Sequence, residues 1–195
     1  MVCPWSMSLR GARCAVRRTA GHGIVALGQR TPPRRVVRHA SRVDTLAVRV
    51  ARPDDYGAIA AVADDWWGRP VSRALPRLFL DHFHGSSRVV EDDHGLAAFL
   101  IAFRSPSRPD VGYIHFVGVR PDHRGTGLAR SLYQDFFRRA LTEGCREVEA
   151  ITAPSNAGSI AFHRSLGFTV NGPVPDYDGP GRPMMTFRRA LANST

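Results

Sequence analysis

The chain has 195 residues, which is enough for one well-cored domain and too few for two. Its apolar fraction of 43% is typical of a globular protein. No apolar run approaches the roughly 20 residues of a membrane-spanning helix, so we predict no membrane partner. The formal net charge of +10 raises the question whether nucleic acid is a partner. The answer depends on where the charges lie along the chain.

The positive charge is concentrated at the N-terminus. Residues 1–43 hold nine Arg and no acidic residue, whereas residues 44–195 hold 18 Arg against 17 acidic residues. The second part is therefore nearly neutral, which argues against nucleic acid as its partner. Residues 1–43 also lack a sustained hydrophobic period, so we predict a disordered Arg-rich arm there and one domain over 44–195. For the arm, four interpretations stay open: a flexible tail, a stretch upstream of the true start, a targeting segment and a nucleic-acid arm.

Three cysteines are scattered through the sequence, at Cys3, Cys14 and Cys145. Their number is odd and no pair has the spacing of a metal site. We therefore predict neither a disulfide framework nor a bound metal. A reducing compartment, the cytoplasm, is the expected location.

The predicted domain begins with a strand and two helices. Residues 46–51 alternate between apolar and polar side chains, as a half-buried strand does. Pro53 and the acids after it suit the first turn of a helix that ends near Gly68. Residues 75–83 form the second predicted helix, with Pro76 in its first turn.

Three β-rich segments follow. Residues 88–92 and 96–103 are joined by a short turn that contains glycine, which is the pattern of a β-hairpin. Residues 111–119 are the third member of the meander. We therefore expect three consecutive antiparallel strands.

A glycine-rich turn leads from the third of these strands into the clearest helix of the chain. Its sequence is Arg124-Gly-Thr-Gly-Leu-Ala129, and apolar residues then repeat along one face up to Leu141. Glycines let backbone approach an anion closely, and the first turn of a helix presents unpaired N–H groups, so the pattern predicts a pyrophosphate site. A plain strand-to-helix turn is the alternative for the glycines alone. The turn is no P-loop, because the chain has no Lys, and Arg130 replaces the third glycine of a dinucleotide-binding turn.

The remaining elements alternate between strand and helix. Residues 147–152 are predicted to form a strand, and Asn156 can cap a short helix over 157–166. A Pro/Gly-rich loop over 172–183 leads to a last strand at 184–188. Antiparallel strands followed by strand–helix–strand predict an α/β (α+β) fold, with a mixed, mostly antiparallel sheet and helices on both faces.

Two motifs, placed one strand apart, connect the chain to a known family. The first is the glycine-rich turn, which is preceded by Val117-x-Val119-x-Pro121. The second is Asn156-x-x-Ser159-Ile-Ala-Phe-His163-x-x-Leu-Gly167-Phe168. With both motifs in this order, residues 46–189 resemble the GNAT superfamily of acetyl-CoA-dependent N-acetyltransferases. The resemblance implies a sheet whose fourth and fifth strands splay apart, acetyl-CoA as co-substrate and no metal.

The resemblance also implies which residues hold CoA. The backbone of the glycine-rich turn would bind the pyrophosphate. The Val117 N–H would donate to the acetyl carbonyl and, in the transition state, to the oxyanion. Asn156 would contact CoA near its thiol end. The residues implied for the CoA site are Val117, Val119, Arg124, Gly125, Thr126, Gly127, Leu128, Ala129, Asn156 and Ser159.

Three residues are candidates for proton transfer. His163 stands where most family members carry the Tyr that protonates the leaving sulfur; its imidazolium could donate instead, and simple packing beside the thioester is the alternative. Tyr113 stands where several histone-type members carry a Glu base. His115, two residues on and on the same strand face, is the better base candidate, with a purely structural histidine as the alternative. Four acids are candidates for an acceptor site: Glu91, Asp92, Asp176 and Asp178.

The sequence thus predicts an acetyl-CoA-dependent N-acetyltransferase that acts by direct transfer on a primary amine of a small molecule or peptide. The alternative is a non-catalytic acyl-CoA-binding protein of the same fold, because the usual Tyr is absent. A homodimer is one assembly that analogy with similar proteins suggests.

Overall fold

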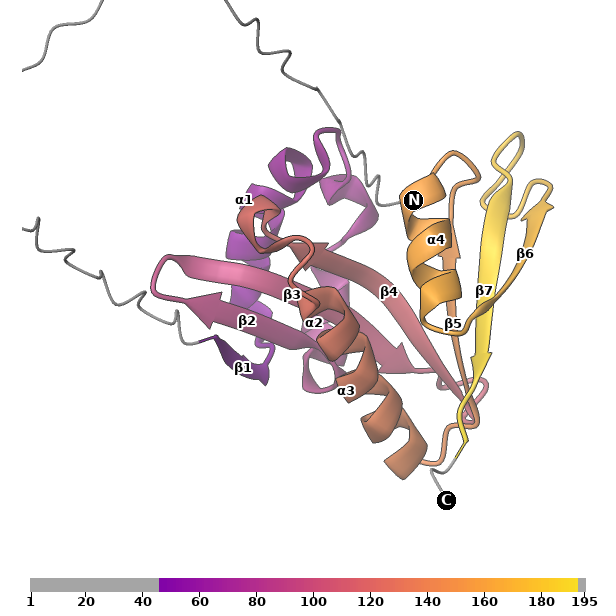
Figure 1. Cartoon of the computed structure of the whole chain (residues 1–195), viewed down its shortest axis with the longest axis horizontal. Coiled ribbons are helices and arrows are strands. Elements are labelled where there is room, and N and C mark those ends of the chain that lie inside the picture. The colour runs from indigo at the N-terminus through magenta and orange to yellow at the C-terminus, as the bar shows by residue number, and fades with distance from the viewer. Residues whose placement is uncertain (1–45, 193–195) are drawn as a thin grey trace, which may run out of the picture. The chain divides into compact units, whose positions relative to one another are not determined.

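The computed structural model describes residues 46–192, and the arm predicted over residues 1–43 lies outside this range. Within the described range the chain forms one seven-stranded sheet in the order β1-β2-β3-β4-β5-β7-β6 (Figure 1). Of its strand pairs, only β4 and β5 run parallel, so the predicted mixed and mostly antiparallel sheet is confirmed. The strands are β1 (Ala47–Val50), β2 (Arg88–Asp92), β3 (Gly95–Arg104), β4 (Val111–Val119), β5 (Glu147–Thr152), β6 (Thr169–Val174) and β7 (Met184–Ala190).

Helices cover both faces of the sheet, as predicted. They are α1 (Tyr56–Trp67), α2 (Leu78–Phe83), α3 (Leu128–Thr142) and α4 (Ala157–Ser165). Helices α1 and α2 pack on one face, and α3 and α4 on the other. None of the helices in the described range has both the length and the apolar composition of a membrane-spanning segment.

Two hydrophobic clusters form because the central strand β3 is buried on both faces. Phe99 and Ile101 point into the cluster under α1 and α2, whereas Leu100 points into the cluster under α3. Gly118 on the neighbouring β4 leaves room for the first cluster, since a Cβ there would collide with the rings of Phe99 and Trp67. The close packing of α1 on β4 therefore depends on a glycine at this position.

Two elements differ from the prediction. The helix predicted over 75–83 begins only at Leu78, because a separate 3₁₀ turn occupies Ser72–Ala74 and Pro76 lies in the link between them. The loop predicted over 172–183 contains the second half of β6, which pairs with β7 across a register shift between Asn171 and Val174. β6 is an edge strand, where a proline costs no ladder hydrogen bond, so a strand can form there despite Gly172 and Pro173. The same composition is typical of a loop, which is why the strand was not predicted.

Strands β4 and β5 separate after a short paired stretch. Their parallel pairing runs only from Val111↔Glu147 to Tyr113↔Glu149, while β4 stays paired with β3 up to Val119. The expected splay is thus present in the sheet (Figure 1).

A bulge in β4 changes which way its side chains point. The register with β3 shifts between Ile101 and Ala102, so that His115 is an extra residue on β4. Ile114 and Phe116 therefore face opposite sides of the sheet, although they are two residues apart. This bulge lies at the point where β4 leaves β5.

Candidate functional site

The glycine-rich turn forms an open cradle at the start of α3. Gly125 and Gly127 have φ angles of 80° and 90°, which L side chains rarely adopt. A Cβ added at either glycine would meet no atom within 4 Å, so the space in front of the turn is open. The first hydrogen bond of α3 runs from the Ser131 N–H to the Gly127 carbonyl, at 3.0 Å. The N–H groups of Leu128 to Arg130 therefore have no partner within the helix.

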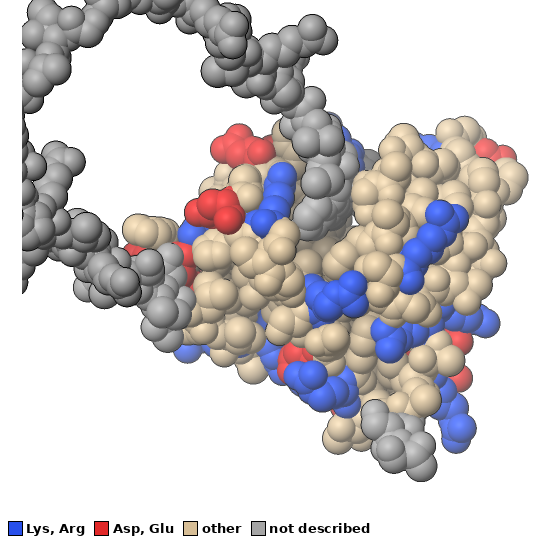
Figure 2. Space-filling view, in the orientation of Figure 1, with Lys and Arg blue, Asp and Glu red and all other residues tan. Residues whose placement is uncertain are grey.

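These features make the cradle a favourable place for a phosphate. Arg side chains spread over α3 and α4 on this face of the molecule (Figure 2), a distribution that favours an anionic ligand. The residues that line the cradle are Val119, His123, Arg124, Gly125, Gly127, Leu128, Ala129, Arg130 and Phe162.

Arg124 takes a different part in the cradle from the one predicted. Its backbone N–H donates to the Pro121 carbonyl at 3.3 Å, within a 3₁₀ turn, so it is already in use. Its guanidinium donates to the carbonyl of Trp66, at the end of α1, and to that of Val119 at 3.3 Å. Arg124 therefore fastens the turn to α1.

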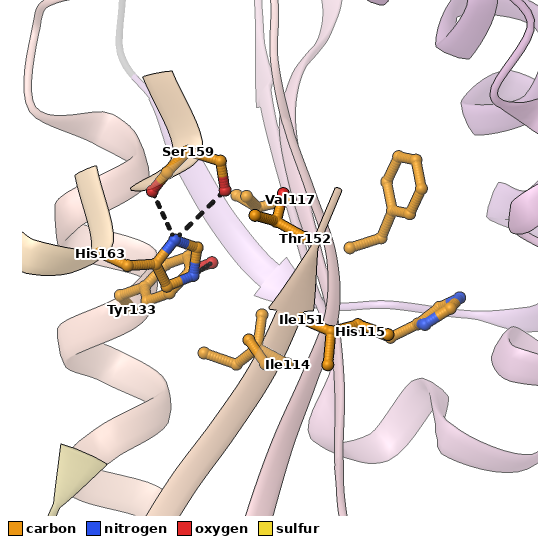
Figure 3. A pocket seen from close by; sticks show the side chains of 10 residues that line it. Ile114, His115, Val117, Tyr133, Ile151, Thr152, Ser159 and His163 are labelled. Carbon is orange, nitrogen blue, oxygen red and sulfur yellow. Dashed lines mark hydrogen bonds between the residues drawn. The ribbon is translucent and has the colours of Figure 1, made fainter. Parts of the chain in front are cut away.

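A second pocket lies where β4 and β5 part, between the strands and helices α3 and α4 (Figure 3). It brings together four of the predicted site residues, His115, Val117, Ser159 and His163. Tyr133 and Thr152, which sequence reasoning assigned no functional part, line it as well. Because Tyr133 belongs to the regular apolar face of α3, its sequence pattern indicates only core packing.

The hydrogen bonds of His163 fix its tautomer. Its Nδ1 lies 2.8 Å from the Ser159 carbonyl, which can only accept, so Nδ1 carries the proton. Nε2 then holds a lone pair that accepts from the Tyr133 hydroxyl, at 3.2 Å. The ring stacks on Phe187 with centroids 3.9 Å apart. Burial lowers the pKa of His163 to about 4, so the imidazolium of the predicted acid role is absent at neutral pH.

The rings of Tyr113 and His115 point to the other face of the sheet, where they contact Phe103 and Phe79, as Figure 3 shows for the direction of His115. The His115 ring stacks on Phe79 at 3.9 Å, and its Nε2 lies 2.8 Å from the Ala74 carbonyl. Nε2 therefore donates and Nδ1 keeps a lone pair, while burial lowers the pKa of His115. Burial raises the pKa of Tyr113, which makes it unsuited as a base at neutral pH.

Asn156 joins the end of β5 to the start of α4. Its Oδ1 accepts from the Ser159 N–H at 3.1 Å, which confirms the predicted cap. Its Nδ2 donates to the Thr152 hydroxyl at 3.2 Å. Asn156 is buried, so the cap holds the pocket wall in place.

A third pocket, with a volume of about 480 Å³, lies beside Asn156 and is bordered by Arg69, Asp178 and Arg182. These residues belong to the loops after α1 and before β7, so no sequence spacing connects them. Among the other predicted acceptor acids, Glu91 pairs with Arg49 at 2.7 Å. Asp92 pairs with Arg120, and Asp176 accepts from the Gly181 N–H at 2.6 Å.

The buried imidazole of His163 predicts a pH-dependent stability. Its pKa of about 4 lies below the ordinary 6.5, so the unfolded chain takes up this proton first as the pH falls. The free energy of unfolding should therefore decrease from pH 6.5 towards pH 4, by up to about 1.4 kcal/mol per pH unit from this residue. Denaturant unfolding of the native protein and of His163→Phe at several pH values measures the difference.

His82, an exposed residue of α2, supplies the matched control. His82→Phe should keep the steep decline of the native protein, whereas His163→Phe should flatten it. Equal declines in all three proteins would contradict a neutral imidazole at His163.

The amino-acid sequence is similar to those of known proteins. A sequence model of the acetyltransferase (GNAT) family matches residues 56–168, more than half of the chain. The chain belongs to the GNAT acetyltransferase family. The GNAT chain is 43% identical over 145 residues to an L-methionine sulfoximine/L-methionine sulfone acetyltransferase of Pseudomonas paraeruginosa, covering 71% of this chain and 83% of the relative.

Other GNAT relatives match over shorter stretches. An L-2,4-diaminobutyric acid acetyltransferase of Halalkalibacterium halodurans is 31% identical over 94 residues, 48% of this chain; the GNAT chain spans 50% of that relative's length. A solved structure supports the fold: a diaminobutyrate acetyltransferase of Paenibacillus lautus, in complex with L-2,4-diaminobutyric acid and coenzyme A. It superposes with a TM-score of 0.60 at 18% identity, over 78% of this chain and 99% of that one.

Proposed function

We propose that this GNAT protein transfers the acetyl group of acetyl-CoA to the primary amine of a small amino acid. The observation that carries the proposal is the arrangement around the β4–β5 splay. The pocket between the strands includes Val117 and Thr152; the glycine cradle starts at Val119, shortly after Val117, and the charged pocket beside Asn156 starts at Ala153, directly after Thr152. The alternative, a non-catalytic acyl-CoA sensor, needs the first two of these pockets and has no use for the third.

The residues at the splay fit acetyl-CoA. The N–H groups of Gly125 and of the first turn of α3 would hold the pyrophosphate, because open space adjoins Gly125 and Gly127 and the start of α3 carries the positive end of the helix dipole. Val117, with Val119 beside it, would place its backbone at the acetyl carbonyl. Asn156 and Ser159 would stand at the thiol end. When bound, acetyl-CoA supplies the thioester that the amine attacks.

The amine must lose a proton, and His115 is the proposed base. Its neutral ring keeps a lone pair on Nδ1, and it lies on the face of the sheet opposite His163. A proton must also reach the departing sulfur. Here the Tyr133 hydroxyl takes the place of the imidazolium, since it lines the pocket and lies 3.2 Å from Nε2 of His163. Its O–H would turn from Nε2 to the departing thiolate, give it the proton, and regain a proton from water once the thiol has left.

The acceptor class follows from the third pocket and the relatives' names. The guanidinium groups of Arg69 and Arg182 suit the carboxylate of an acceptor, and Asp178 suits a cationic group of the same acceptor. Two relatives are named for the amino acids L-methionine sulfoximine and L-2,4-diaminobutyric acid. An amino acid offers both a carboxylate for the guanidinium groups and an amine for the reaction.

Release of free thiol from acetyl-CoA in the presence of an acceptor panel tests this proposal. The panel contains L-methionine sulfoximine, L-2,4-diaminobutyric acid, a short peptide with a free N-terminus and 1,3-diaminopropane, which is diaminobutyric acid without its carboxylate. We expect kcat/KM for the amino acids to exceed that for 1,3-diaminopropane by about tenfold or more, the effect of one charge-assisted contact. Binding of CoA with no thiol release above hydrolysis for any acceptor would support the sensor instead.

A further inference from the structure

The tip of the β2–β3 hairpin reaches the glycine-rich turn through Asp92. The side chain of Asp92 is 0% exposed, although it stands at the end of a strand. It accepts hydrogen bonds from both terminal nitrogens of Arg120, one of them at 3.1 Å, and from the His94 N–H at 2.8 Å. Its Oδ2 also lies 2.9 Å from Nε2 of His123, and the same Nε2 lies 2.8 Å from a terminal nitrogen of Arg120, so the three side chains form one cluster. The hydrogen bonds from Arg120 hold the pKa of Asp92 well below its usual range.

The two side chains that Asp92 contacts stand at either end of the 3₁₀ turn Pro121–His123. That turn leads directly into the cradle, and His123 is itself part of the cradle wall. The His123 carbonyl accepts from the Thr126 hydroxyl at 2.8 Å. Asp92 is therefore connected to the cradle by two successive polar contacts, through His123 and Thr126.

The cradle is thus held from two sides. On one side Arg124 donates to the Trp66 carbonyl, and on the other Asp92 holds Arg120 and His123. Glycines lose more backbone freedom on ordering than any other residue, so a turn with two of them is costly to hold in one shape. Contacts that fix this shape before the ligand arrives lower the cost of binding.

We propose that Asp92 is a positioning residue for the CoA pyrophosphate, fixing the glycine cradle through Arg120 and His123. The inference rests on the proposed binding of CoA. It concerns a residue outside both family motifs, on a strand that contributes no residue to the lining of the cradle.

Electrostatics and positioning predict changes of opposite sign in the affinity for CoA when this carboxylate is removed. Asp92 carries a negative charge close to the site of an anion, so its removal alone would tighten CoA binding. If Asp92 acts by positioning, its removal weakens CoA binding instead. The sign of the change in Kd therefore separates the two explanations.

Titration calorimetry with CoA on Asp92→Asn and Asp122→Asn measures this sign. Asp122 lies on the same 3₁₀ turn and pairs with Arg120 at 2.8 Å, but its side chain is 65% exposed, whereas that of Asp92 is buried. Both variants lose the same charge. We expect Asp92→Asn to raise the Kd for CoA about tenfold, as expected for the loss of one charged hydrogen bond, and Asp122→Asn to leave it unchanged or lower it.

Three further measurements keep the result unambiguous. Asp92→Glu retains the charge and displaces the carboxylate. Positioning therefore predicts weaker CoA binding by this variant, whereas electrostatics alone predicts no change in the Kd. Thermal melting verifies that each variant is folded. Pantetheine, which lacks the pyrophosphate, should bind the native protein and Asp92→Asn equally. Unchanged or tighter CoA binding by folded Asp92→Asn and Asp92→Glu would overturn the proposal. A native protein that does not bind CoA would refute the proposed function itself.

Discussion

Gly127→Glu is expected to abolish CoA binding, raising its Kd by about 100-fold or more. Gly127 has a φ of 90°, where an L residue costs about 1–2 kcal/mol. The new side chain would enter the open space in front of the turn, because no atom lies within 4 Å of its Cβ. Its carboxylate would then repel a pyrophosphate at the positive end of α3. Calorimetric titration of CoA, with thermal melting as the measure of folding, gives the result.

Gly144→Glu is the matched control for this variant. Gly144 follows the other end of α3, has a φ of 86° and likewise has open space around its Cβ position. It therefore carries the same backbone strain and the same added charge, away from the cradle. CoA binding should survive in Gly144→Glu. Loss of binding in both variants, or in neither, would contradict the placement of the pyrophosphate.

Tyr133→Phe is expected to lower kcat about 100-fold while the Kd for CoA stays near its native value. The substitution removes only the hydroxyl that contacts His163 at 3.2 Å, and the ring keeps its packing against Phe162 and Phe168. Binding of the pyrophosphate does not involve this pocket, so the effect should fall on turnover. Steady-state rates with saturating acetyl-CoA, together with CoA titrations, separate the two quantities.

Tyr56→Phe removes a hydroxyl on α1 and should leave kcat unchanged. His163→Phe should lower kcat as well, because it removes the group that orients the Tyr133 hydroxyl. A native rate for Tyr133→Phe beside a slow His163→Phe would show that His163 itself moves the proton.

Strong local patterns made much of the fold predictable. Strand β4 and strand β5 have the predicted bounds, and α3 begins at the predicted Leu128, because each is a regular hydrophobic run next to glycine or a turn. The start of α2 and the presence of β6 were not predictable in this way. At β6 the pairing with β7 outweighs the preference of Gly172 and Pro173 for a loop.

The candidate site was predictable in its residues and less so in their chemistry. The two motifs named Val117, Ser159 and His163, which the structure brings into one pocket. Their protonation depends on burial and on the Ser159 carbonyl, which no spacing reveals. The roles proposed for Tyr133 and Asp92 rest on contacts between distant segments, so a single sequence holds no periodic signal for either.

Because of the bulge at His115, β4 presents pocket-lining side chains to both faces of the sheet at one level. Ile114 and Val117 look towards α3 and α4, whereas His115 and Phe116 look towards α1 and α2. Under the proposed function, the donor and the amine can therefore approach from opposite sides and meet in the gap beside β5. Neither has to leave before the other binds, so we expect direct transfer within a ternary complex.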